Sequence, residues 1–150
     1  ILVLTLSKRA IFRTKLGHTK PGTYICRGRS KSYLSFGSRY EKNSSSEDDT
    51  IITFIGNKIF SLIGKIFFSL PITDILYTFV LGKTKKVNDL NLLSKDFCFC
   101  VELPIKAYKN NLKLTSSPAN ERKRIAGTKK VNAFKDGFKI LISMIKLKLS

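Results

Sequence analysis

The sequence predicts an α/β fold, on three observations. Two stretches, residues 53–70 and 133–149, carry apolar side chains at helical spacing. Between them lie two runs that predict strands, residues 112–117 and the β-branched and aromatic run 75–81. The chain has 150 residues, of which 43% are hydrophobic, and this is enough for one domain with a modest core.

The N-terminal residues differ from the rest of the chain in their charge. Residues 1–40 contain nine Lys or Arg and no Asp or Glu, whereas the whole chain has 28 basic and 10 acidic residues. They show no sustained period of 2 or 3.6, so we expect irregular backbone with one short strand near residues 33–36. We therefore divide the chain into an unassigned basic segment, residues 1–35, and a folded part, residues 36–150. Because the chain begins at Ile1 rather than Met, we expect it to be a fragment.

A polar segment, residues 43–49, comes next and ends in the acids Glu47, Asp48 and Asp49. Three successive carboxylates are the kind of hard ligand that suits a divalent cation. The alternative is a solvated linker that leads to the start of a helix. We favour the linker.

Residues 53–70 predict a helix that is apolar around most of its circumference, with its polar residues on one narrow stripe. Residues 51–72 are long enough to span a membrane, but each lysine in the middle would cost about 2.5 to 3.5 kcal/mol at a bilayer centre. We therefore expect this helix to lie in the membrane interface, with its lysines near headgroups and its apolar residues among acyl chains. The alternative is a core helix of a soluble domain. The predicted interface residues are Lys58, Lys65, Phe67 and Phe68.

The middle of the chain is predicted to alternate between strand and helix. Residues 71–74 end the first helix, 75–81 form a buried strand, and 83–86 form a turn. Leu103 and Ala107, with lysines opposite them, then predict a short amphipathic helix. We expect it to extend over residues 102–110, with Pro104 in its first turn.

The last predicted elements are the strand over residues 112–117 and a terminal helix over 133–149. In that helix Lys139 and Lys146 share one face, and Phe138 is turned away from them. It is the second basic amphipathic helix, and we include Phe138 among the interface residues.

The most basic stretch of the chain lies between that strand and that helix. Gly127 lets its backbone bend, so its cationic side chains can gather in one place. Such a loop suits a pyrophosphate or a lipid phosphate, and the alternative is a solvated loop without a ligand. Its cations are Arg122, Lys123, Arg124, Lys129 and Lys130.

The net charge of +18 indicates an anionic partner, which could be nucleic acid, an anionic membrane or a phosphorylated substrate. His18 is the single histidine, so the sequence gives little support to a histidine metal site or to a Ser-His-Asp triad. Cys26, Cys98 and Cys100 lack a zinc spacing and are expected to be reduced, mostly buried thiols. We assign no metal ligand in this chain.

A series of short motifs runs through residues 36–148. In chain order they are Gly37-Ser-Arg-Tyr40, Gly56-Asn57 with Phe60, Phe67-Phe68, Thr73-Asp74, Glu102 with Ile105-Lys-Ala107, Ser117-Pro118, Glu121 to Arg124, Gly127 and Phe134-Lys-Asp-Gly137. Their order and spacing resemble the second half of a family 2 glycosyltransferase. The resemblance is closest to the dolichol-phosphate mannosyltransferase-like branch.

The resemblance implies the C-terminal, acceptor-side part of a GT-A nucleotide-diphospho-sugar transferase fold. Such an enzyme moves a sugar from a nucleotide-sugar donor to a polyprenyl (dolichyl) phosphate or similar acceptor, at the cytoplasmic face of a membrane to which it binds peripherally. The complete enzyme would use Mg²⁺ or Mn²⁺ held by an Asp-x-Asp segment, and this chain contains no Asp-x-Asp. We expect the chain alone to be inactive for that reason.

The resemblance also implies roles for single residues. Asp74 would lie near the acceptor pocket and Glu102 on the helix that faces the active site, which makes these two the catalytic candidates. Arg122 and Arg124, together with Lys129 and Lys130, would bind donor or lipid phosphate; we do not separate their roles further.

Two other functions remain open at this point. The charge of +18 also suits a basic module that binds RNA or DNA, although no zinc finger, RNP-like strand or helix-turn-helix signature is present. The chain could equally be a truncated product without activity of its own. Of these, nucleic acid is the partner that we favour least.

Overall fold

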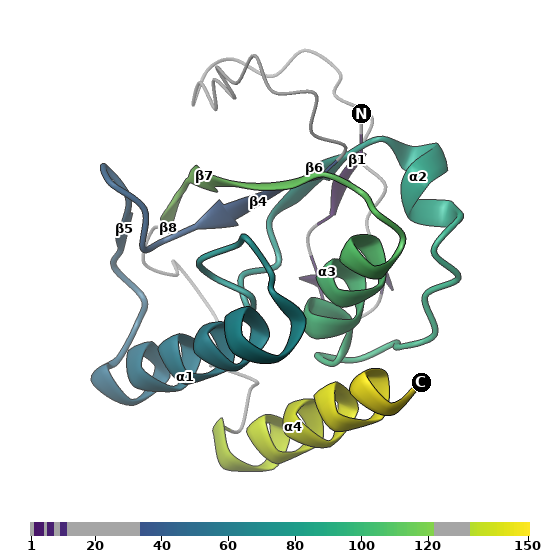
Figure 1. Cartoon of the computed structure of the whole chain (residues 1–150). Helices are drawn as coiled ribbons and strands as arrows, with labels where there is room; N and C mark the ends of the chain where they lie inside the picture. The colour runs from purple at the N-terminus through teal and green to yellow at the C-terminus, as the bar shows by residue number, and fades with distance from the viewer. Residues whose placement is uncertain (1, 5, 8–9, 12–33, 122–132) are drawn as a thin grey trace.

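The computed structural model describes residues 2–4, 6–7, 10–11, 34–121 and 133–150. Its centre is a mixed sheet with the strand order β1-β6-β4-β7 (Figure 1). The strands β1 and β4 both pair antiparallel with β6, and β4 pairs parallel with β7. The four strands are β1 (Leu2–Leu4), β4 (Leu34–Ser38), β6 (Val80–Gly82) and β7 (Leu114–Pro118).

Two strand pairs lie outside this sheet. One is antiparallel and joins β2 (Leu6–Ser7) to β3 (Ala10–Ile11). The other is parallel and joins β5 (Ser45–Ser46) to β8 (Asn120–Glu121). Because β5 follows β4 and β8 follows β7, this second pair continues the parallel arrangement beyond the end of the sheet.

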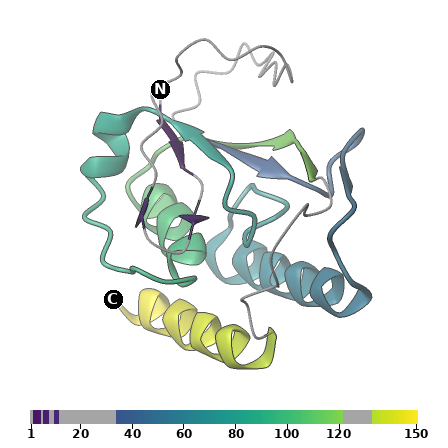
Figure 2. The ribbon, with the colours of Figure 1, turned by 180° about the vertical axis from the view of Figure 1, so that it is seen from behind.

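The helices cover one side of the sheet in two layers (Figures 1 and 2). In the first layer, α3 contacts β7 and also α1; in the second, α4 lies against both helices. The short helix α2 follows β6 at the end of the sheet away from α1. The helices are α1 (Ile51–Phe68), α2 (Thr84–Asn88), α3 (Phe99–Lys109) and α4 (Ala133–Leu149).

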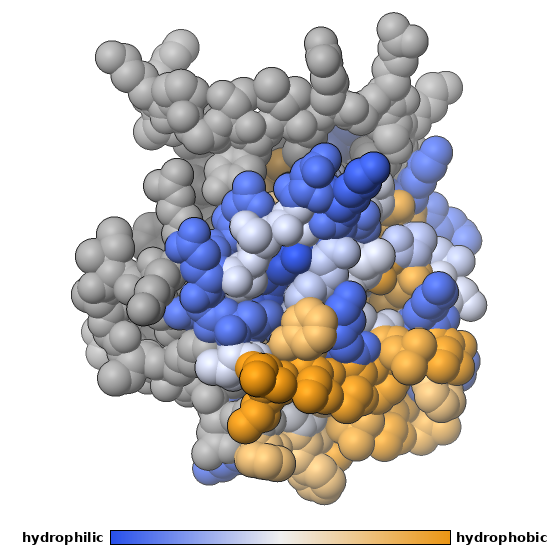
Figure 3. All heavy atoms as spheres, turned by 90° about the vertical axis from the view of Figure 1, so that its left-hand side faces the viewer, coloured by the Kyte–Doolittle hydropathy of each residue, from blue (hydrophilic) through white to orange (hydrophobic). Residues whose placement is uncertain are grey.

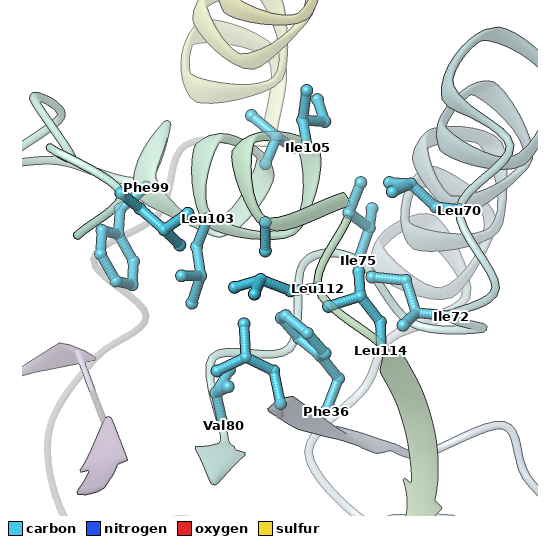
Figure 4. Packing of buried hydrophobic residues seen from close by; sticks show 14 of the residues in the cluster. Phe36, Leu70, Ile72, Ile75, Val80, Phe99, Leu103, Ile105, Leu112 and Leu114 are labelled. Atoms are coloured by element: carbon cyan, nitrogen blue, oxygen red, sulfur yellow. The ribbon is translucent and has the colours of Figure 1, made fainter. Parts of the chain in front are cut away.

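The hydrophobic core lies between the sheet and α3, and Figure 4 shows its side chains converging there. Sheet residues such as Phe36 and Val80 meet Leu103 of α3 and Leu112 of the turn that follows it. A second contact layer joins α4 to this core through Ile140 and Met144, both less than 6% exposed. The fully buried members of the core include Leu34, Phe36, Ile75, Val101, Leu103, Ile105, Ala107 and Met144.

Local interactions determine where α1 begins and ends. Thr50 caps its N-terminus by accepting the Thr53 N–H, and the Thr53 side chain accepts the Thr50 N–H in return. At the other end Ser69 adopts a left-handed conformation with φ of 53°. Gly64 faces the core, where a Cβ atom would lie 3.0 Å from Ile75 Cδ1, so the glycine allows the segment after α1 to pack closely against the helix.

The structure confirms the α/β class and most of the predicted elements. The first predicted helix corresponds to α1, and the terminal helix spans the predicted residues 133–149. The strand expected near residues 33–36 is β4, and the one expected at 112–117 is β7. These patterns are repeated over many residues or bounded by turn residues, so the sequence locates them well.

Three predictions in the middle of the chain are wrong. Of the expected strand 75–81, only residues 80 and 81 lie in a strand, which is β6. At the start of the run, the Ile75 N–H donates to Ser61 Oγ at 3.1 Å instead of to a neighbouring strand. Residues 84–86 of the expected turn 83–86 lie in α2, and Lys83 is the N-cap of that helix. The third helix begins at Phe99, three residues before the predicted start, which places Pro104 inside it, where proline removes one helical hydrogen bond.

The predicted division of the chain between residues 35 and 36 falls inside β4. Upstream of it, where irregular backbone is expected, the structure has the short strands β1, β2 and β3. Because β1 pairs with β6, part of the N-terminal segment belongs to the same sheet as the rest.

Candidate functional site

Arg39 lies at the centre of a cluster of charges at one edge of the sheet. The strands β4 and β7 run parallel, so their carboxyl ends meet at this edge, and Arg39 directly follows β4. Glu121 follows β7, while Asp49 and Asp74 come from the segments on either side of α1. Four separate parts of the chain therefore contribute to what we call the Arg39 cluster, which consists of Arg39, Asp49, Asp74 and Glu121.

The pair of Arg39 and Asp74 is the best-defined contact of the cluster. Arg39 Nε donates to Asp74 Oδ2 at 2.8 Å, and Nη2 donates to Oδ1 at 3.1 Å. The Arg39 backbone N–H also points to Oδ2, at 3.3 Å. Asp74 is only 1% exposed, so this bidentate arrangement provides the compensation that a buried carboxylate needs.

The remaining guanidinium nitrogen of Arg39 faces two further carboxylates. Its Nη1 donates to Glu121 Oε2 at 3.2 Å and lies 3.4 Å from Asp49 Oδ2. Ser46 supports Glu121 with a hydrogen bond of 2.6 Å. One cation thus neutralises only part of the charge of three carboxylates. Burial disfavours the charged guanidinium, but the hydrogen bonds and charge of Asp74 outweigh this, so the pKa of Arg39 lies above its ordinary value.

Aromatic rings enclose the cluster. The Arg39 guanidinium lies over the Tyr77 ring at 4.8 Å from its centroid, a cation–π contact. The Tyr40 hydroxyl donates to Asp49 Oδ2 at 2.9 Å and accepts from Asn57 Nδ2 at 3.0 Å. Burial is the main cause that raises the pKa of Tyr40 above its usual range, so this hydroxyl stays protonated and remains a donor.

A cavity of about 330 Å³ opens beside the cluster, toward the start of α1. Its polar wall includes Arg39, Tyr40 and Asp49, and its apolar wall includes Ile51 and Phe54. Thr73 precedes Asp74 in the sequence, and its hydroxyl contacts other polar groups within 3.3 Å. These partners are the Ser38 and Ser116 hydroxyls and the Glu41 carboxylate.

The cluster does not fit a divalent metal. Both oxygens of Asp74 are already bonded to Arg39, and the guanidinium occupies the space between the three carboxylates. Within the described part of the chain, no group of three or more His, Cys, Asp or Glu side chains is arranged to hold a metal ion. The acids of the polar segment 43–49 do not form such a group either, since Asp49 accepts from Tyr40 and from Thr53.

Glu102, the second catalytic candidate, belongs to a different hydrogen-bond network. Its carboxylate is 3% exposed and accepts the backbone N–H groups of Leu93 and Ser94 at 2.8 and 2.7 Å. Lys106 Nζ donates to it at 2.8 Å. Burial disfavours its charged form, but Lys106 and the two N–H groups outweigh that effect and lower the pKa of Glu102. The structure thus uses Glu102 to hold the loop before α3, and it does not bring Asp74 and Glu102 together.

The helices α1 and α4 expose a large apolar surface, which Figure 3 shows as a continuous patch at the bottom of the molecule. Each helix contributes a stripe whose members are separated by four, four, three and four residues, which is the spacing of one helical face. We call the two stripes together the apolar face. It consists of Ile51, Ile55, Ile59, Leu62 and Ile66 of α1 and Phe134, Phe138, Ile142, Ile145 and Leu149 of α4.

Most of the predicted interface residues are exposed, and Phe138 is the one that belongs to the apolar face. Phe67 and Phe138 are more than half exposed, and Lys58 and Lys65 are exposed beside the stripe of α1. Phe68 is half-buried, packs against the core, and lies under Lys148, so it does not belong to the face. Among the described residues, α1 is the one helix that is long and apolar enough to span a membrane, judged by length and composition only.

The predicted phosphate-binding residues lie outside the described part of the chain. They are Arg122, Arg124, Lys129 and Lys130, and the first of them is the residue after Glu121. Glu121 itself accepts hydrogen bonds from Arg39 and Ser46. The sequence predicts no role for Arg39 by itself, and it offers Asp49 only as a possible cation ligand together with Glu47 and Asp48. The available signal is Arg39 itself, a single arginine in the motif Gly37-Ser-Arg-Tyr40, which follows the predicted strand near residues 33–36.

Comparison of the chain with protein-family models, with curated proteins and with solved structures finds no match.

Proposed function

We propose that the chain is the acceptor-side part of a membrane-associated glycosyltransferase, which transfers a sugar from a nucleotide-sugar donor to a polyprenyl phosphate or a similar acceptor. The observation that carries the proposal is the convergence of motifs on the Arg39 cluster. Gly37-Ser-Arg-Tyr40, Thr73-Asp74 and Glu121 are far apart in the sequence, yet Arg39 bonds both carboxylates. These are three of the motifs in which the sequence resembles family 2 glycosyltransferases.

The position of the cluster supports a binding site. In α/β folds, ligands bind at the carboxyl ends of parallel strands, and the cluster lies at the ends of β4 and β7. The neighbouring cavity has a polar wall at Arg39 and an apolar wall at Ile51 and Phe54. The apolar wall suits the hydrocarbon chain of an acceptor. Arg39 is already bonded to Asp74 and Glu121, so we assign the acceptor phosphate to the cations that follow Glu121 in the sequence.

The chemistry of such a transfer assigns different roles to the two kinds of charge. The bond between the sugar and the nucleoside diphosphate breaks while an acceptor phosphate oxygen attacks, so negative charge builds on the leaving diphosphate. Arginines stabilise that charge well, and we assign this role to Arg122 and Arg124. Both follow closely after Glu121, which accepts a hydrogen bond from Arg39. The acceptor phosphate is already ionised at neutral pH, so Asp74 serves to position Arg39 rather than to act as a base.

The apolar face supports membrane association. A contiguous exposed apolar surface marks a docking site, and here exposed lysines flank it on both helices. Because the buried side of α1 packs on α4 and on residue Ile75, α1 can lie along a membrane without leaving the domain. We therefore place the protein at the cytoplasmic face of a membrane, bound peripherally. The GT-A fold and the use of Mg²⁺ or Mn²⁺ in the complete enzyme are part of the same proposal.

Transfer itself tests the proposal. The chain, alone and extended by the residues encoded upstream of Ile1, is incubated with vesicles that contain polyprenyl phosphate, with labelled nucleotide sugars, and with Mg²⁺ or Mn²⁺. We expect labelled lipid from the extended protein and none from the chain alone. An upstream region that encodes no Asp-x-Asp, or an extended protein without transfer from any donor, contradicts the proposal. Salt-sensitive RNA binding without sedimentation on anionic vesicles would instead favour a nucleic-acid-binding module.

A further inference from the structure

A groove of about 600 Å³ runs between α4 and the loop that precedes α3. Lys95 lies on the loop side, and Lys139 and Lys146 lie on the α4 side. The groove is separate from the Arg39 cluster, with which it shares no lining residue. We call it the α4 groove.

The α4 groove is basic, and its lysines are available. All three are exposed, and none of them forms a salt bridge with a carboxylate in the described part of the chain. Asp96 is the one acid among the lining residues, and its Oδ1 accepts the Cys98 N–H at 3.0 Å. Three cations and one anion leave a local charge that matches a doubly charged anion.

The rim of the groove is apolar and continuous with the apolar face. Ile142 is a member of that face and also lines the groove. Leu93 lines it from the loop side and is 80% exposed. An anion held by the lysines would therefore lie at the level where the apolar face enters acyl chains, which is the position of a lipid headgroup.

We propose that the α4 groove binds the headgroup of a lipid with a phosphate monoester. Lys95, Lys139 and Lys146 hold the phosphate, the hydroxyls of Ser94 and Ser143 offer further hydrogen bonds, and Leu93 and Ile142 contact the first part of the acyl chains. The monoester is favoured over a diester because its second negative charge matches the local excess of cations. The inference rests on the membrane docking that forms part of the proposed function.

The first experiment compares two variants on vesicles. Lys139→Gln with Lys146→Gln removes two lysines of the groove, and Lys42→Gln with Lys85→Gln removes two exposed lysines elsewhere. Vesicles contain phosphatidic acid or, at matched surface charge, phosphatidylserine. We expect the unmodified chain to prefer phosphatidic acid, the groove variant to bind it about tenfold more weakly, and the control variant to lose less than about threefold. Equal losses in both variants, or no preference for the monoester, would overturn the proposal.

The second experiment removes the membrane. Dihexanoyl phosphatidic acid, below the concentration at which it forms micelles, is titrated into the chain while the amide NMR signals of Cys98 and Ser143 are followed. We expect saturable shifts that the groove variant loses, and an affinity for inorganic phosphate at least about fivefold weaker. Equal affinity for inorganic phosphate contradicts a lipid site. Because this titration needs neither transfer activity nor a bilayer, its outcome is separate from that of the transferase proposal.

Discussion

The Arg39 cluster buries charged residues, whereas the apolar face exposes large apolar residues. In the cluster, a guanidinium and the fully buried Asp74 lie inside the protein. In the apolar face, residues such as Ile55 and Phe138 are more than half exposed. Charges are costly inside unless they are paired, and large apolar patches on a surface mark docking sites. The first region has its ion pairs within the chain, whereas the second requires a partner to cover it.

Helix α1 connects the two regions. Its N-terminal end begins next to Asp49 of the cluster, and Ile51 then starts the apolar stripe. The buried side of the same helix carries Ser61 and Gly64. Substitutions in the two regions should therefore separate stability from membrane binding, although both regions touch one helix.

The largest effect is expected in the cluster. Arg39→Ala leaves three carboxylates without their cation, and removing one partner of a buried ion pair costs about 3 to 5 kcal/mol in the free energy of unfolding. Urea denaturation followed by circular dichroism measures this. Arg39→Lys serves as the matched variant and should lose less, because it keeps the charge but not the bidentate fork. A loss below about 1 kcal/mol for Arg39→Ala would show that the fold does not depend on Arg39 to neutralise these carboxylates.

The second effect concerns the apolar face. Ile55→Asp with Ile145→Asp places one charge in each stripe, at residues that are both 52% exposed. We expect binding to anionic vesicles to fall by about tenfold or more, while the free energy of unfolding changes by less than about 1 kcal/mol. Tyr108→Asp, at an exposed site of α3 outside the face, is the control for sedimentation. If the double variant unfolds but still binds, the face is part of the core and not a docking surface.

The third effect concerns Glu102, a buried carboxylate that, like Asp74, has its hydrogen-bond partners within the chain. Glu102→Gln should lower the free energy of unfolding by about 1 to 3 kcal/mol at neutral pH, because buried N–H groups and Lys106 lose their charged acceptor. The pKa of Glu102 is lower in the folded chain, so its contribution is present above the unfolded value of about 4.3 and is lost as the pH falls through the folded value.

Denaturation at a series of pH values checks that sign. The difference between the unmodified chain and Glu102→Gln should shrink below about pH 4. Asp89→Asn, at an exposed carboxylate after α2, should show no comparable change. A difference that stays constant with pH would mean that the loss comes from packing and not from charge.

Prediction from the sequence succeeds where the information is local. The helices α1 and α4 repeat their apolar spacing over four turns or more, and Thr50 supplies a cap that the sequence itself contains. The run 75–81 shows the limit of this approach. Its composition favours a strand, but the Ser61 side chain, from the preceding helix, takes the Ile75 N–H.

The Arg39 cluster could not be predicted as a unit for the same reason. Its members are separated in the sequence by up to 82 residues and follow no common period. The motifs predict that these segments contribute to one site, but they also predict that Glu102 belongs to the same site as Asp74. In the structure Glu102 instead accepts hydrogen bonds from the Leu93 and Ser94 N–H groups.

The sequence by itself determined the two amphipathic helices, the α/β class, the excess of positive charge and the apolar composition of α1, since each depends on neighbours within a few residues. The tertiary structure alone decided which carboxylates Arg39 neutralises and which side of each helix remains exposed. It also placed Lys95 opposite Lys139 across the α4 groove. These outcomes depend on how the sheet and helices pack, because burial and ion pairing are properties of groups brought together from distant parts of the chain.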